Sequence, residues 1–164
     1  MEGRAKRGFT LFEIVLVIAI LLSLTMLISI KRGNEQIALE NTANEISSAI
    51  RYARNCYDSG DSSVYFTIAA KEGQYHARVI EKGFVTTLDI PIEKFIKLSK
   101  KSRTDEDESF HNFFPMNTKP LEIRFYPNAS TGISILLQSE GSSSKYVISV
   151  VPTSSRVHLY KINE

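Results

Sequence analysis

An acidic residue inside an otherwise apolar segment is the group in this sequence with the clearest chemical consequence. Glu13 is the only charged residue between Phe9 and Ile30. A carboxylate at the centre of a membrane helix costs roughly 2.5–3.5 kcal/mol by insertion scales, and less near the interface. Glu13 is therefore expected either to pair with a cation or to extend its side chain toward lipid headgroups.

Groups that could act in catalysis are sparse. His76, His111 and His158 are separated by more than thirty residues each, without metal-ligand spacing, and Cys56 is the single cysteine. The chain contains no G-x-S-x-G, no H-E-x-x-H and no phosphate-binding glycine loop. We expect His76 and His158 to be structural residues on strands and Cys56 to be a small packing residue. The prediction is a protein that is not an enzyme and has no cofactor.

Neither a metal nor nucleic acid is predicted as a ligand. Four consecutive acids, Asp105–Glu108, lack the alternating oxygen spacing of a calcium loop and are expected to form a solvated loop. The net charge is only +2, and outside residues 1–8 the basic and acidic residues balance. DNA binding requires clustered cations. The C-terminal candidates are spread over four predicted strands and opposed by acids; they are Arg124, Lys145, Arg156 and Lys161.

The apolar segment that contains Glu13 is long enough to cross a membrane. As a helix, Phe9–Ile30 would reach about 33 Å, against about 30 Å for a hydrocarbon core. Basic residues lie before it, and Lys31 and Arg32 follow it. A cleaved signal peptide is one interpretation, but no A-x-A-like site follows the segment. A signal anchor with its basic end in the cytoplasm is another, and it leaves Glu13 unexplained.

A third interpretation comes from a resemblance. The sequence Lys6–Glu13, K-R-G-F-T-L-F-E, resembles the processing site of type IV prepilins and pseudopilins. The resemblance implies that prepilin peptidase cuts between Gly8 and Phe9 and that Phe9 is then N-methylated. It also implies that Glu13 pairs with the new α-ammonium of a neighbouring copy in a filament. We favour this interpretation, because motif, basic leader, segment length and acid position agree.

Beyond the apolar segment the pattern stays helical. Apolar residues recur at alternating spacings of four and three, which places them on one helix face: Leu39, Ala43, Ile46, Ile50, Ala53 and Tyr57. We predict one helix from about Phe9 to Tyr57, roughly 70 Å long. Gly33-Asn34 is where a bend or local melting is expected, since glycine weakens a helix by about 1 kcal/mol. The apolar face is predicted to pack on a domain.

After residue 58 the apolar period changes to two, which predicts strands. The 100–120 stretch looks irregular, and Phe95–Leu98 could be a short strand or a turn. The predicted fold class is α+β, a long N-terminal hydrophobic helix packed on an antiparallel β-sheet domain. The predicted strands are Val64–Ala69, Tyr75–Glu81, Phe84–Ile90, Glu122–Tyr126, Ile133–Gln138, Lys145–Val151 and Arg156–Ile162.

A second resemblance concerns the domain. Ala49–Asn55, A-I-R-Y-A-R-N, resembles a motif near the helix end in the GspH/FimT group of minor pseudopilins and minor pilins, and the strands after Phe125 follow that group's order. Two glycines usual in the group are replaced here by Ala129 and Ser155. Without them positive φ is less accessible, so different turn types are expected. Some members bind DNA and some major pseudopilins hold calcium, but neither is predicted here.

These resemblances imply a minor pseudopilin of a type II secretion system. Its expected parts are a leader (1–8), a transmembrane and filament-core helix (9–30), an amphipathic continuation (31–57) and a periplasmic β-rich domain (58–164). The expected location is the bacterial inner membrane, single-pass with a cytoplasmic N-terminus, and then the periplasmic pseudopilus. Expected partners are prepilin peptidase, other pseudopilins, the inner-membrane assembly platform and membrane lipid. The alternatives are a minor pilin of a type IV pilus or competence system, and a membrane-anchored periplasmic enzyme.

Overall fold

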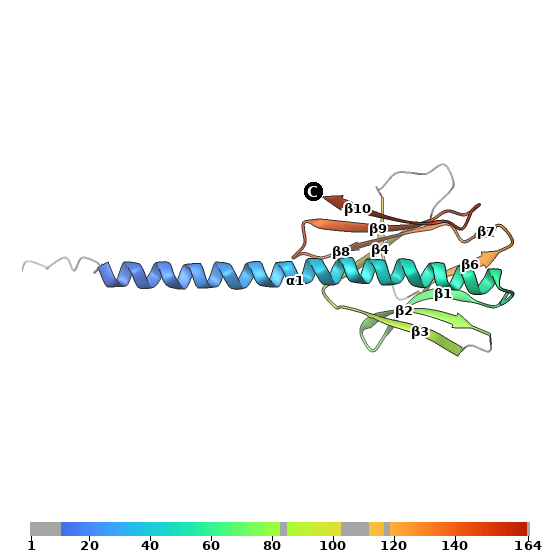
Figure 1. Cartoon of the computed structure of the whole chain (residues 1–164), viewed down its shortest axis with the longest axis horizontal. Coiled ribbons are helices and arrows are strands. Elements are labelled where there is room, and N and C mark those ends of the chain that lie inside the picture. Colours follow the sequence, from blue (N-terminus) through green and yellow to red (C-terminus); the bar gives the residue numbers. More distant parts are fainter. Residues whose placement is uncertain (1–10, 83–84, 103–111, 117–118, 164) are drawn as a thin grey trace, which may run out of the picture.

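The computed structural model describes residues 11–82, 85–102, 112–116 and 119–163. Within these residues the chain forms one long helix and ten strands arranged in two sheets. Figure 1 shows the N-terminal half of the helix projecting from a domain built around its C-terminal half. Gly8, Phe9 and the acidic run Asp105–Glu108 lie outside the described residues.

Helix α1 spans Leu11–Asp58 without interruption. The predicted bend or melting at Gly33-Asn34 does not interrupt it, because both residues are helical. The predicted apolar face is confirmed: its members from Leu39 to Ala53 are fully buried, and Tyr57 is half-buried. The first fully buried residue along α1 is Leu39, and the first half of the helix, up to about residue 30, projects from the domain.

The strands fall close to the segments in which apolar residues alternate. Alternation persists where one face is buried, as in β6, whose successive residues are buried and exposed in turn. The strands are β1 (Tyr65–Lys71), β2 (Gln74–Glu81), β3 (Val85–Ile92), β4 (Lys97–Ser102), β5 (Phe114–Pro115), β6 (Leu121–Tyr126), β7 (Ala129–Ser130), β8 (Ile133–Gln138), β9 (Ser144–Val150) and β10 (Val157–Asn163).

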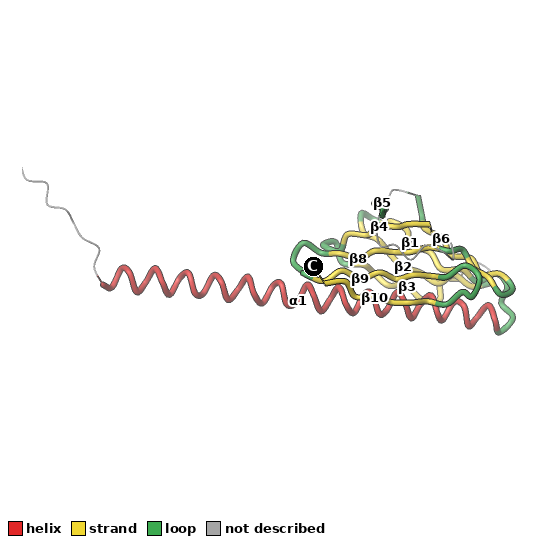
Figure 2. Tube along the Cα trace, turned by 90° about the horizontal axis from the view of Figure 1, so that it is seen from above, coloured by secondary structure: helices red, strands yellow, loops and turns green. Residues whose placement is uncertain are grey.

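The two sheets are antiparallel throughout and interleaved in chain order. The first sheet has the order β3-β2-β1-β6-β7, and the second has the order β10-β9-β8-β4-β5. The chain leaves the first sheet after β3, enters the second with β4 and β5, and returns for β6 and β7. In Figure 1 strands β8, β9 and β10 of the second sheet lie on one side of α1, and β1, β2 and β3 of the first sheet lie on the other. Figure 2 shows α1 running along one face of both.

One hydrophobic core joins the helix and both sheets. Ile46 and Ile50 of α1 are fully buried, as are Phe66 of the first sheet and Ile135 and Ile148 of the second. Burying an aliphatic side chain of this size contributes about 1.5–3 kcal/mol. The C-terminal half of α1 is therefore part of the domain and cannot separate from it without exposing the core. The α+β class is confirmed.

The expectation of an irregular 100–120 stretch is wrong in part. Lys100–Ser102 continue β4, and Phe114–Pro115 form β5 beside it. The backbone of β4 pairs with β8 along its whole length, so strand geometry there does not depend on alternating apolar side chains. Ile96 closes a turn onto Glu93 just before β4, and the predicted strand or turn at Phe95–Leu98 is thus both.

Candidate functional site

The projecting half of α1 is an exposed apolar surface. Its most apolar window has a mean hydropathy of 2.8 and none of it is buried, so this helix is long and apolar enough to cross a membrane. Leu11 and Phe12 are 80% and 74% exposed. An apolar surface of this size is stable only when lipid or other protein covers it.

The few hydroxyl groups on this surface bond back to the helix. Ser23 donates to the Ala19 carbonyl at 2.8 Å, and Ser29 donates to the Thr25 carbonyl at 2.9 Å. Thr25 in turn donates to the Leu22 carbonyl at 2.8 Å. With their hydrogen bonds made inside the helix, these residues add little cost to an apolar environment.

Glu13 lies in the first turn of α1 as described, on the exposed surface. The α-amine of Phe9, the predicted partner of Glu13 in a neighbouring copy, lies outside the described residues. The predicted pairing therefore stays a prediction.

Two glutamates tie α1 to the second sheet just beyond the projecting half. Glu35 accepts a hydrogen bond from the Ser139 hydroxyl at 2.9 Å. A Cβ on Gly141 would overlap the Glu35 carboxylate, so the glycine makes room for this contact. One turn further along, Glu40 accepts a hydrogen bond from the Tyr146 hydroxyl at 2.8 Å. These contacts fix the direction in which the apolar half leaves the domain.

The Tyr146–Glu40 contact predicts a stability change at alkaline pH. Burial, followed by the hydrogen bond and the charge of Glu40, raises the pKa of Tyr146 to about 12 from 10.0. Because the folded pKa is above the unfolded one, the stabilisation is complete below pH 10 and is lost as pH rises through 12. Tyr146→Phe should flatten the free energy of unfolding across that window, measured by chemical denaturation of the full chain in detergent.

A second tyrosine is expected to leave some pH dependence in the free energy of unfolding of Tyr146→Phe. The pKa of Tyr52 is also raised to about 12, by side-chain hydrogen bonds with Cys56 and Glu81. The double variant Tyr52→Phe/Tyr146→Phe should therefore be flatter than either single variant. An alkaline profile of Tyr146→Phe that superimposes on the wild type would refute the raised pKa of Tyr146 in the folded protein.

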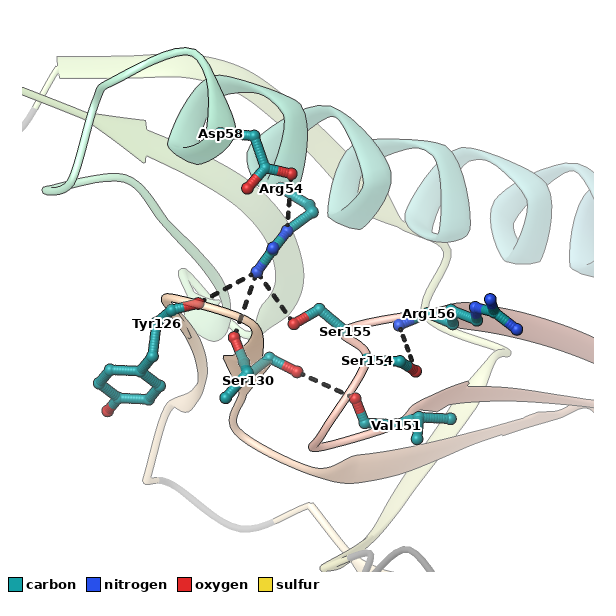
Figure 3. Close-up of polar contacts among 9 residues, drawn as sticks. Arg54, Asp58, Tyr126, Ser130, Val151, Ser154, Ser155 and Arg156 are labelled. Carbon is teal, nitrogen blue, oxygen red and sulfur yellow. Dashed lines mark hydrogen bonds and ion pairs between the residues drawn. The ribbon is translucent and has the colours of Figure 1, made fainter.

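At the opposite end of the domain, the guanidinium of Arg54 joins the end of α1 to two turns (Figure 3). Its Nε donates to Asp58 at 2.9 Å. Its Nη1 lies 3.3 Å from the Tyr126 carbonyl oxygen, 3.2 Å from that of Ala129 and 3.0 Å from the Ser155 hydroxyl. The fork geometry of arginine suits such divergent acceptors. We call these contacts the Arg54 junction.

Positive φ angles surround the Arg54 junction although the glycines are missing. Ser155 has φ of 51° and Asn128 has φ of 59°. The expectation that the missing glycines make positive φ less accessible is therefore wrong at Ser155. Asparagine tolerates this region, whereas serine there is uncommon. Ser155 is held by its amide, which donates to the Val151 carbonyl at 2.8 Å, and by the Arg54 contact.

Comparison of the chain with protein-family models, with curated proteins and with solved structures gave no match in any of the three.

The other candidate residues do not assemble into a reactive site within the part of the chain that the structure describes. His76 pairs with Asp89 at 2.9 Å, and His158 stacks on Tyr160. The Sγ of Cys56 lies 3.7 Å from the Oε1 of Glu81. No group of three described His, Cys, Asp or Glu residues could hold a metal ion.

The C-terminal basic residues are divided between the two sheets. Arg124 on β6 pairs with Glu122 at 3.0 Å and lies over the Tyr65 ring. Lys161 on β10, in the second sheet, lies 3.9 Å from Glu40. Arg124 and Lys161 thus lie on different sheets, each near an acid of its own.

Sequence reasoning missed the contacts that orient the helix. Glu35, Glu40 and Arg54 flank the apolar face of α1, where they look like solvent-facing residues. The hydrogen-bond partners of Glu35 and Glu40 lie about a hundred residues further along the sequence, so no local spacing reveals these contacts. The one available signal was the repeated arginine of Ala49–Asn55, which the family resemblance singled out.

Proposed function

We propose that this protein is a minor pseudopilin of a type II secretion system, with a type IV pilin-like fold, assembled as a structural subunit into a periplasmic pseudopilus. The observation that carries the proposal is the single helix α1. One continuous rod has an apolar, exposed first half with one acid near its start and a second half buried in a domain. Such a rod can hold the domain against a membrane and later pack beside copies of itself.

The exposed half of α1 suits two environments in turn. In the bilayer, lipid covers the apolar side chains at a gain of about 0.8 kcal/mol for each buried CH₂ group. In a filament, neighbouring helices would cover the same side chains, so transfer between the two requires no refolding. Glu13 is the one residue for which the two environments differ. At the membrane interface its carboxylate can face the headgroups, whereas inside a filament it would need a cation beside it.

The Arg54 junction supports the family assignment. The three stretches that carry the second resemblance meet there, although they are distant in the sequence: Ala49–Asn55, the turn after Phe125, and the Ser155 turn. A motif whose parts contact one another has a structural reason to occur together. The domain would then be the part that contacts other pseudopilins in the periplasm.

Processing gives a direct test. Full-length protein from cells with an active prepilin peptidase should begin at an N-methylated Phe9 by mass spectrometry. Gly8→Leu should retain the leader, because a side chain before the scissile bond blocks entry to a narrow active site. Gly3→Leu, in the same leader, is the matched control and should be processed normally. An uncut wild-type chain in such cells would overturn the proposal.

Deletion of the gene separates secretion from the pilus alternative. Loss of exoprotein secretion with intact transformation, motility and adhesion is the expected result. Intact secretion with loss of transformation, motility or adhesion would assign the subunit to a type IV pilus or competence system instead.

A further inference from the structure

A pocket lies where the projecting half of α1 enters the domain. It has a volume of about 490 Å³ and is lined by the helix through Ile28, Lys31 and Arg32, and by the domain through Phe95, Lys97 and the 140–141 turn. We call it the basal pocket. Apolar and basic side chains therefore meet in one place, from two parts of the chain.

The acids in the basal pocket are already engaged. Glu35 accepts the hydrogen bond from Ser139 and rests on Gly141. Glu140 forms an ion pair with Lys97. The exposed side chains of Lys31 and Arg32 have no hydrogen-bond or ion-pair partner among the described residues. The pocket therefore offers two cations to a ligand.

The position of the basal pocket along α1 selects the ligand. The uncharged run Ile14–Ile30 ends one residue before Lys31. At 1.5 Å per residue this run extends about 25 Å, so Lys31 and Arg32 lie near the far boundary of the hydrocarbon core. That is the depth of lipid phosphates. Ile28, immediately below, lies at the depth of the first acyl carbons.

We infer that the basal pocket binds the phosphate of an anionic phospholipid in the leaflet opposite to the leader. The guanidinium of Arg32 can donate two parallel hydrogen bonds to phosphate oxygens, and Lys31 adds a point charge. Ile28 and Phe95 contact the apolar part of the same lipid. This inference rests on the proposed membrane insertion, and it gives the inserted subunit a specific lipid that must be released before the helix leaves the bilayer.

Native mass spectrometry of the full chain tests the inference. The protein is inserted into vesicles that contain phosphatidylglycerol and phosphatidylcholine and is then released in mild detergent. Bound phosphatidylglycerol should exceed its share of the vesicle lipid. Lys31→Gln/Arg32→Gln should lower the bound phosphatidylglycerol about tenfold, since each cation near a lipid surface contributes on the order of a fewfold in affinity.

A control variant matches the charge change away from the basal pocket. Lys82→Gln/Arg156→Gln removes two exposed cations near the Asp61 and Ser155 turns and should retain the lipid as the wild type does. Equal losses in both double variants, or retention of phosphatidylcholine in its vesicle proportion, would overturn the inference. Displacement of the lipid by millimolar glycerol phosphate would reassign the pocket to a soluble phosphate.

The outcome is separable from that of the proposed function. A chain that is cut after Gly8 and enters filaments, yet retains no phosphatidylglycerol preferentially, refutes the basal pocket alone. A chain that is never cut refutes the pseudopilin assignment, while lipid retention by the inserted protein still decides whether the basal pocket binds phosphate.

Discussion

Glu13→Ala is expected to leave cleavage and methylation intact and to lower incorporation into filaments more than tenfold. In a stack of helices the carboxylate would be buried beside the α-ammonium of the adjacent copy. Removing one partner of a buried ion pair leaves the other charge unpaired, at about 3–5 kcal/mol. Each subunit contact would carry that cost. The measurement is the ratio of this protein in sheared filaments to that in membranes, by quantitative blotting.

Conservative variants separate charge from shape. Glu13→Gln keeps the size of the side chain but not its charge and should assemble as poorly as the alanine variant. Glu13→Asp keeps the charge and should restore part of the assembly. Ser23→Ala is the matched control on the same apolar surface, because its hydroxyl bonds only within the helix. Normal assembly of Glu13→Gln would show that the carboxylate is not a charge partner.

The periodic elements could be predicted from the sequence because their side-chain spacing is local. A face repeating every three to four residues from Leu39 to Ala53 packs as predicted. The predicted strands likewise match β6, β8 and β9 to within one residue at each end, whereas β7 was not predicted. In α1 and β6 one face is buried and the other is exposed, so the spacing of apolar residues in the sequence indicates the structure directly.

Other parts of the fold could not be predicted in this way. The continuation of β4 through Lys100–Ser102 depends on backbone pairing with β8, more than thirty residues further along. The division of the strands into two interleaved sheets has the same origin. Local composition shows only that these residues are polar. In the sequence, a polar strand that is held by backbone pairing cannot be distinguished from a loop.

The candidate site likewise has parts that follow from contiguous residues and parts that depend on contacts between distant segments. Gly8, Phe9 and Glu13 were assigned from contiguous residues and a resemblance, and of these only Glu13 lies within the described residues. The basal pocket needs Phe95 beside Lys31, which sequence alone does not place together. The positive φ of Ser155 is supported by Arg54. The two residues are far apart in the sequence but hydrogen-bonded in the fold.

Arg54→Ala is expected to destabilise the domain by about 3 kcal/mol. The side chain of Arg54 is only 17% exposed, and its Nη1 serves three acceptors. Removing it deprives the part-buried Ala129 carbonyl of this donor, and it frees Ser155 from the contact that helps to hold its positive φ. The measurement is urea unfolding of the full chain in detergent, followed by near-ultraviolet circular dichroism.

Arg51 supplies the matched control from the same helix. It makes a single exposed hydrogen bond, 3.2 Å from the Val157 carbonyl oxygen. Arg51→Ala should therefore cost less than about 1 kcal/mol. Arg54→Lys should lie between the two, because an ammonium keeps the charge but cannot reach Asp58 and the divergent carbonyls together. Equal losses for Arg51→Ala and Arg54→Ala would mean that the Arg54 junction does not hold the two turns against the helix. In that case the convergence of the three motif stretches would have no energetic basis.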